Sequence, residues 1–157
     1  MVKTKLVKGQ SLFEVMVTLM IVSLVITAVA GMALLSIKAS NFSKNKTQAT
    51  RYIQEANEWL RSQKDGGWGV FLTKVSSLSV DLADGQRRIC LQTINNWSQK
   101  SVCLDTDVIT GTNLVRNVKF DTSVPNTVTA TVSIYWSDSG GIHQINSVTI
   151  FSNWENK

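Results

Sequence analysis

The spacing of hydrophobic positions changes twice along the chain, and these changes divide it into three parts. From Val15 to Ile37 no residue carries a charge. At about 1.5 Å per residue, a helix over this run is roughly 35 Å long, which is enough to cross a hydrocarbon core of about 30 Å. The run therefore predicts a single membrane-spanning helix over residues 10–37 and a membrane-anchored protein.

After Ile37 the pattern becomes amphipathic. Apolar residues recur at helical spacing with charged residues between them, which predicts that the helix continues over residues 38–65. Asp65 and the two glycines after it are typical of a helix end, so we expect the helix to stop near Lys64. The apolar stripe is interpreted as a core-facing surface rather than a binding site, and it comprises Ala49, Tyr52, Ile53, Ala56, Trp59 and Leu60.

From Trp68 onward the helical spacing is lost, and β-branched runs alternate with turn residues. Short connections between such runs indicate antiparallel strands, which we expect to form a meander of about four to six strands over residues 66–157. The predicted fold is α+β, with the second half of a long N-terminal helix packed on this small sheet. The expected strands are Val75–Ala83, Arg87–Ile94, Ser98–Leu104, Leu114–Asp121, Val128–Trp136 and Ile142–Phe151.

The chain holds two cysteines, Cys90 and Cys103, so only one intramolecular pairing is possible. A hairpin with its turn at Asn96 and Trp97 would place the two cysteines opposite each other. In a non-hydrogen-bonded pair their Cα atoms would be about 4.5 Å apart, which is compatible with a disulfide. The alternative is two unrelated surface thiols. The same register would turn four apolar neighbours toward the helix, namely Ile89, Leu91, Val102 and Leu104.

The net charge of +5 is concentrated before the apolar run. Lys3, Lys5 and Lys8 account for three of the 16 Lys and Arg residues, so a chain without residues 1–9 would carry 13 against 11 Asp and Glu, a net charge of +2. The remaining cations are dispersed. This distribution does not favour nucleic-acid binding.

Residues able to perform catalysis are few. His143 is the only histidine, and it lies beside a predicted turn where we expect a solvated side chain. Asp105 and Asp107 are interpreted as turn acids rather than as a catalytic pair. Two cysteines without a neighbouring histidine or a second cysteine pair are a poor zinc site. The sequence therefore predicts a protein that is not an enzyme and that has no cofactor.

The residues around the start of the apolar run restrict the kind of anchor. A secretory signal peptide has an apolar core of about 7 to 15 residues, and the present run is longer. A plain membrane anchor fits the length but leaves Glu14 unexplained, because a carboxylate at the edge of a membrane helix costs free energy unless it reaches headgroups or a partner. The local sequence runs from Lys8 through Gly9, Gln10, Ser11, Leu12 and Phe13 to Glu14.

This segment resembles the processing signature of type IV prepilins and of type II secretion pseudopilins. That signature is a short basic leader ending in Gly, a few mostly apolar residues, a Glu and a long apolar helix. The resemblance implies that prepilin peptidase removes residues 1–9 by cutting between Gly9 and Gln10, so that Glu14 becomes the fifth residue of the mature chain. It also implies a pilin-like fold and a filament in which Glu14 offsets the positive terminus of an adjacent subunit.

Two positions depart from the common family pattern. Many members have Phe where this chain has Gln10, so the mature terminus could be N-methylated or could cyclise to a neutral pyroglutamyl group. Many pilins have a helix-breaking Pro where this chain has Gly31. Gly costs about 1 kcal/mol relative to Ala within a helix, so it permits local unwinding without forcing it. The other interpretation of Gly31 is a small residue that lets neighbouring helices approach.

Charge alone leaves the orientation in the membrane open, because three lysines precede the apolar run and three follow it. Paired cysteines require an oxidising compartment, so their pairing would place the globular part outside the cytoplasm. We therefore expect a single-pass protein of the cell membrane that becomes part of a surface filament. The three lysines after the run are Lys38, Lys44 and Lys46.

The expected function is that of a minor pilin, and the Asn153-Trp154 pair near the end of the chain adds a looser likeness to minor pilins. The resemblance implies other pilin or pseudopilin subunits, prepilin peptidase, the inner-membrane assembly platform and membrane lipids as partners. A pseudopilin of a type II secretion or DNA-uptake system is an alternative with the same anchor. A different alternative is a single-pass membrane protein with an extracellular binding domain that uses Trp68, Trp97 or Trp136.

Overall fold

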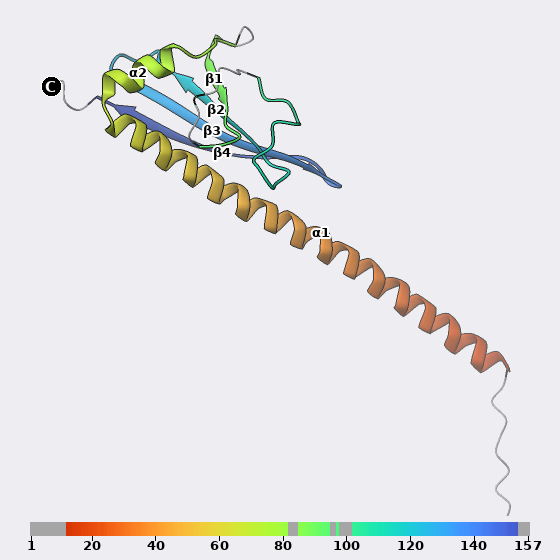
Figure 1. Cartoon of the computed structure of the whole chain (residues 1–157). Helices are drawn as coiled ribbons and strands as arrows, with labels where there is room; N and C mark the ends of the chain where they lie inside the picture. Colours follow the sequence, from red (N-terminus) through yellow and green to blue (C-terminus); the bar gives the residue numbers. More distant parts are fainter. Residues whose placement is uncertain (1–11, 82–84, 95–96, 98–101, 154–157) are drawn as a thin grey trace, which may run out of the picture. The chain divides into compact units, whose positions relative to one another are not determined.

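The computed structural model describes residues 12–81, 85–94, 97 and 102–153, and it has an α+β fold (Figure 1). The strands form one antiparallel sheet in the order β1-β2-β3-β4, so each strand pairs with the next along the chain. Two compact units, Met1–Asn41 and Phe42–Lys157, share the first helix. The elements are α1 (Leu12–Asp65), α2 (Trp68–Ser76), β1 (Arg87–Cys90), β2 (Val115–Asp121), β3 (Thr127–Asp138) and β4 (Gly141–Ser152).

The second part of α1 packs on the sheet through the predicted apolar stripe. Ala49, Ala56 and Leu60 are fully buried, Ile53 and Trp59 nearly so, and Tyr52 packs at the margin of the core. The helix ends at Asp65, where the Gly66 N–H donates to the Ser62 carbonyl over 3.0 Å. The next residue, Gly67, has a φ of 129°, which favours glycine and stops the helix. The stripe and the helix end agree with the sequence prediction.

Strand β3 supplies the centre of the core from the sheet side. Its buried and less buried residues alternate along the strand, as the period of two in a half-buried strand requires. The predicted alternation is confirmed, and β4 likewise covers the predicted Ile142–Phe151. The buried residues of β3 are Val128, Ala130, Val132, Ile134 and Trp136.

The helix α2 was not predicted, and the expected strand Val75–Ala83 is wrong over its described residues. Val75 lies in α2, and Val80 forms only an isolated bridge with Arg87. The β-branched residues of this segment suggested a strand, but the segment forms a helix because that conformation buries its apolar side chains. Apolar side chains at helical spacing pack on the core, and this spacing was the sequence signal for a helix: Trp68, Phe71, Leu72 and Val75.

The predicted hairpin that places Cys90 opposite Cys103 is also wrong over its described residues, and Asn96 of its turn and residues 98–101 of its second strand lie outside them. Strand β1 ends at Cys90 and pairs with β2, so that Asn117 is the partner of Cys90 in the sheet. Val102 and Leu104, which should have faced the helix, are 58% and 56% exposed. Strand β2 is the partner of β1, and its buried row completes the core.

Candidate functional site

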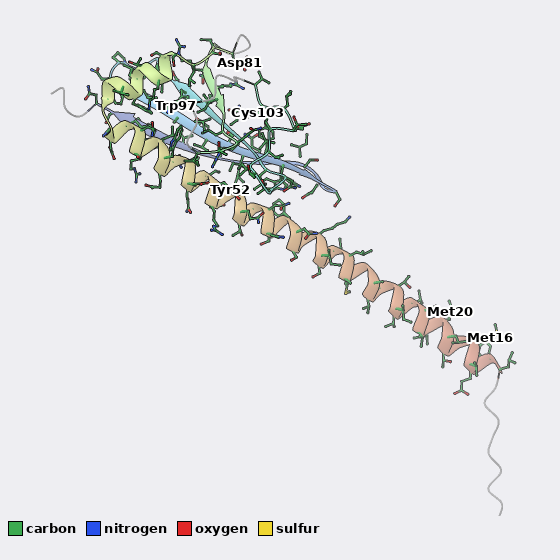
Figure 2. All side chains as sticks on the ribbon, viewed as in Figure 1. Met16, Met20, Tyr52, Asp81, Trp97 and Cys103 are labelled. Carbon is green, nitrogen blue, oxygen red and sulfur yellow. A yellow bond between two sulfur atoms is a disulfide. The ribbon has the colours of Figure 1, made fainter. Side chains whose placement is uncertain are left out.

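The apolar part of α1, from Leu12 to Ile37, has its side chains open on every side. The exposed fractions of its large apolar side chains range from 38% to 79%, and Met16 and Met20 project from the helix in Figure 2. It belongs to the one described helix that is long and apolar enough to cross a membrane, judged by length and composition. A helix that is hydrophobic all round needs lipid or other apolar helices as cover.

The hydroxyl side chains between Val15 and Gly31 are satisfied within the helix itself. Thr18 Oγ1 donates to the Val15 carbonyl over 2.9 Å, and Ser23 Oγ donates to the Met20 carbonyl over 2.8 Å. Thr27 bonds back to the preceding turn in the same way. These bonds let the helix lie in an apolar environment without unpaired hydroxyl groups between Val15 and Gly31.

Glu14 is the exception, because it is the only charged residue from Leu12 to Ile37. It lies in the first turn of α1 as described, where a carboxylate is favoured by the partial positive charge of a helix start. No hydrogen bond or ion pair joins it to another described residue.

The other predicted positions of the anchor are only partly described. Gly9 and Gln10, the predicted cleavage site, lie outside the described residues. Gly31 lies within an unbroken helix, and a Cβ atom added there would meet no atom within 4 Å. Both interpretations of Gly31, local unwinding and close helix approach, stay predictions.

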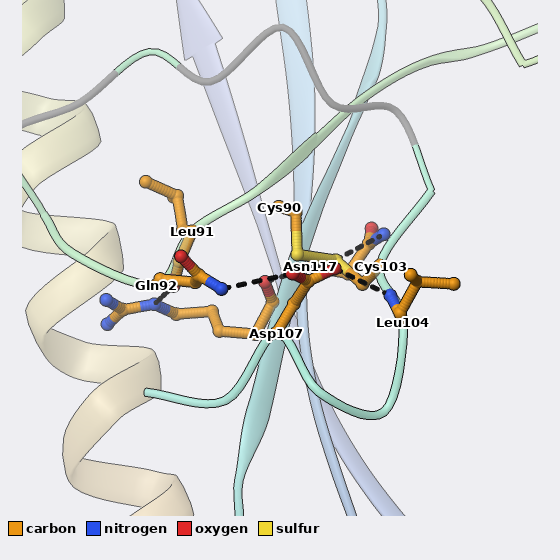
Figure 3. Close-up of a disulfide and its surroundings, with 8 residues drawn as sticks. Cys90, Leu91, Gln92, Cys103, Leu104, Asp107 and Asn117 are labelled. Atoms are coloured by element: carbon orange, nitrogen blue, oxygen red, sulfur yellow. Dashed lines mark hydrogen bonds between the residues drawn. A yellow bond between two sulfur atoms is a disulfide. The ribbon is translucent and has the colours of Figure 1, made fainter. Parts of the chain in front are cut away.

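Cys90 and Cys103 are joined in a disulfide with a Cα–Cα distance of 5.3 Å (Figure 3). The predicted bond is confirmed, although the hairpin register that suggested it is wrong. The disulfide connects the end of β1 to an irregular segment, and Asn117 of β2 lies against it with its Nδ2 3.6 Å from the Cys103 sulfur. Among the described residues no strand pairing joins Cys90 to Cys103, so the disulfide supplies the link between them.

Asp107 organises the irregular segment after Cys103. Its carboxylate accepts from the Leu104 N–H over 2.8 Å and from Gln92 Nε2 over 3.1 Å (Figure 3). Its own N–H donates to the Leu104 carbonyl over 2.9 Å. These bonds form a turn between Leu104 and Asp107, as the interpretation of Asp107 as a turn acid requires, and Asp105 lies within the same turn.

The most buried charged side chain in the described residues is Arg116, which the sequence analysis did not single out. It lies on β2 in the same row as Val118 and Phe120 and is 1% exposed. Its Nε donates to the Leu91 carbonyl over 3.1 Å, and its Nη1 donates over 3.1 Å to the Tyr52 carbonyl. One guanidinium therefore connects α1, β2 and the segment after β1.

An acid completes the environment of Arg116. Nη1 also lies 3.1 Å from Glu55 Oε2, whose side chain is 50% exposed. Burial lowers the pKa of the Arg116 guanidinium, and the bond to Glu55 opposes this shift. The position of Arg116 in the alternating pattern of β2 was the available sequence signal, because a charge in a core-facing row needs partners.

Replacing Arg116 with Met should destabilise the globular domain by about 2 kcal/mol, because the Leu91 carbonyl would lose its donor inside the core. Glu55→Gln should cost less than about 1 kcal/mol, because the carboxylate is half exposed and water screens the pair. Thermal unfolding of both variants, followed by near-ultraviolet circular dichroism, measures the difference. Equal midpoints for the two variants would contradict the buried role of Arg116.

The three tryptophans of the binding-domain alternative all contact the core. Trp136 is 2% exposed, and Trp68 and Trp97 pack against the buried cluster. The Trp97 ring lies 5.0 Å from the Trp59 ring and stacks on Phe120 at 6.0 Å between centroids. Their packing gives all three tryptophans a part in the core, and the binding-domain alternative stays a prediction.

His143 differs from the solvated side chain that we expected. Its exposed fraction is 27%, and its Nε2 lies 2.9 Å from Asp138 Oδ1. The Gly140 N–H, which donates to the same oxygen over 2.7 Å, and the His143 ring both hold the pKa of Asp138 below its usual range. Asp138 therefore stays ionised, and these bonds persist until the pH falls through that lowered pKa.

Among the described residues, no group of three His, Cys, Asp or Glu side chains could hold a metal ion. Comparison with family models, with curated proteins and with solved structures finds no match to this chain. Function must therefore be inferred from the residues and their geometry.

Proposed function

We propose that this protein is a minor pilin, a structural subunit that prepilin peptidase processes and that assembles through its N-terminal helix into a type IV pilus-like filament. One observation carries the proposal. Glu14 is the single charged residue in the part of α1 from Leu12 to Ile37, which is apolar on all sides and whose hydroxyl groups between Val15 and Gly31 are satisfied internally. Such a helix is suited first to lipid and then to a bundle of like helices.

The processing signature gives Glu14 a partner. Cleavage after Gly9 creates a terminal ammonium at Gln10, a few residues before the carboxylate. In a filament of staggered helices, the terminus of one subunit can lie beside Glu14 of its neighbour, so that each charge offsets the other away from water. The sheet domain, covalently fastened by the disulfide, is then displayed outside the cytoplasm at the filament surface.

A pseudopilin of a type II secretion or DNA-uptake system has the same anchor and the same processing. It differs in what its short filament moves, and the residues around Gly9 do not distinguish the two. Neighbouring genes do: a secretin with cargo, competence proteins or a retraction ATPase would each indicate one system.

Mass analysis of the mature N-terminus tests the proposal. The full chain, produced in a host with prepilin peptidase and extracted from membranes, should begin at Gln10. The terminal peptide should carry an amine, free or methylated, because a pyroglutamyl group would remove the charge that pairs with Glu14. The Gly9→Val variant should keep residues 1–9, because the larger side chain prevents the close approach of the protease.

Other N-termini would contradict the proposal. A wild-type protein whose first residue is Met1 in that host, or a residue after Ile37, would exclude processing as a prepilin. The single-pass binding protein of the alternative predicts that residues 1–9 stay attached.

A further inference from the structure

Three rings meet at the end of the β3–β4 hairpin, one of them from α1. The Phe42 ring lies 5.0 Å from the His143 ring at an interplanar angle of 65°, and 6.1 Å from the Trp136 ring. The Trp136 and His143 rings are 5.4 Å apart. Edge-to-face and tilted arrangements at these distances are the favourable ones for aromatic pairs.

The hairpin holds the His143 ring in place for this contact. Trp136 and His143 are direct partners across β3 and β4. Asp138, fixed by the Gly140 N–H, accepts the bond at His143 Nε2. A Cβ atom at Gly140 would lie 3.1 Å from Asp138 Oδ1 and 3.6 Å from His143 Nε2, so glycine leaves room for this bond.

On α1 the Phe42 contact stands apart from the main packing surface. The buried residues of the helix begin at Ala49, seven positions further along, and the residues between are exposed or half-buried. Phe42 is also the first residue of the compact unit that contains the sheet. Between Phe42 and Ala49, therefore, the aromatic contact of α1 with the sheet is made by the Phe42 side chain.

We propose that Phe42, Trp136, Asp138 and His143 form a latch that determines where α1 becomes rigidly held by the sheet domain. With the latch closed, the held segment begins at Phe42. With the latch open, it begins at Ala49, so about 10 Å of helix changes from held to free at about 1.5 Å per residue. The inference goes beyond the proposed function and holds for any protein in which this helix carries the domain.

Spin labels at two positions of α1 test the latch in the full chain in detergent micelles. Gln144→Cys on β4 is paired with Lys46→Cys, which precedes Ala49, or with Gln54→Cys, which follows it. All three positions are exposed, and the native cysteines are bonded to each other and do not take the label. Double electron–electron resonance then gives the distance distribution of each pair.

Phe42→Ala should at least double the width of the 46–144 distribution and leave the 54–144 distribution unchanged. His143→Ala should have the same effect from the other side, and the double variant should add nothing, because both changes remove one contact unit. Ser43→Ala, an exposed neighbour on the same helix, is the matched control and should change neither distribution.

Two results would overturn the latch. One is an unchanged 46–144 width in both alanine variants. The other is equal broadening of the 54–144 pair, which would show that the whole helix has loosened from the sheet. A thermal midpoint close to wild type in Phe42→Ala would confirm that the domain stays folded, as the 38% exposure of this side chain implies.

Discussion

Glu14→Val should be cleaved and inserted in the membrane as efficiently as the wild type but should be missing from filaments. The carboxylate is the only charge between Leu12 and Ile37, and no other described residue pairs with it. Valine therefore suits the isolated helix in lipid, so insertion should not suffer. The loss should occur where the terminal ammonium of a neighbouring subunit needs a counter-charge.

The size of this effect follows from burial of the pair between apolar helices. Removing one member of a buried ion pair typically costs about 3–5 kcal/mol, because the remaining charge is left uncompensated. At about 1.4 kcal/mol for each factor of ten in an equilibrium constant, incorporation should fall by at least a hundredfold. Glu14→Gln keeps the shape and loses the charge, so it should resemble Glu14→Val if charge matters and the wild type if shape matters.

The measurement compares the protein in sheared filaments with the protein in the membrane fraction of the same cells. Thr18→Val, one turn further along the helix and also exposed, is the matched control and should enter filaments normally. Normal incorporation of Glu14→Val would mean that the carboxylate only reaches lipid headgroups, and it would end the proposed role of this residue.

Loss of the disulfide should lower the thermal midpoint of the globular domain by roughly 12–24 °C. Cys90 and Cys103 are 13 residues apart, and closing such a loop stabilises the fold by about 3 kcal/mol in the chain-entropy model. For a domain of about 100 residues, each kcal/mol shifts the midpoint by about 4–8 °C near the transition, and less in larger domains. The closed loop also carries Trp97, whose ring packs against the core.

Thermal unfolding of the full chain in micelles, with and without reductant, measures this shift. The Cys90→Ser, Cys103→Ser double variant should unfold at the same temperature as the reduced wild type and should not respond to reductant. A shift of only a degree or two on reduction would contradict the stabilising role. Free thiols in protein isolated from cells would contradict both the bond in vivo and the expected location outside the cytoplasm.

Local periodicity was a sound guide wherever one side of an element faces the core. The stripe of α1 from Ala49 to Leu60 and the alternation of β3 were predicted position by position, because burial of one face leaves a period in the sequence itself. The helix α2 carried the same kind of signal at Trp68, Phe71 and Val75. Its β-branched residues obscured that signal, and packing on the core outweighed their preference for strands.

For the candidate site, too, the sequence predicted the features that depend on adjacent residues. The sequence located the apolar run and the lone Glu14, because both are properties of adjacent residues and of the free energy of charge in lipid. It also identified the cysteine pair, since two cysteines allow one bond. The register offered for that bond was wrong over the described residues, because β1 pairs with Val115–Asp121 and not with the predicted strand Ser98–Leu104.

By itself, then, the sequence determined the long apolar helix, its amphipathic continuation, the main strands and the identity of the disulfide, all of which depend on residue type and local spacing. The tertiary structure alone decided which strands pair, why Arg116 can be buried and how Phe42 meets His143. Each of these depends on groups that are distant in the chain: Arg116 takes its partners from α1 and from the segment after β1, and Phe42 lies about a hundred residues from His143. The free energy of such contacts comes from shared desolvation and shape, which no local period records.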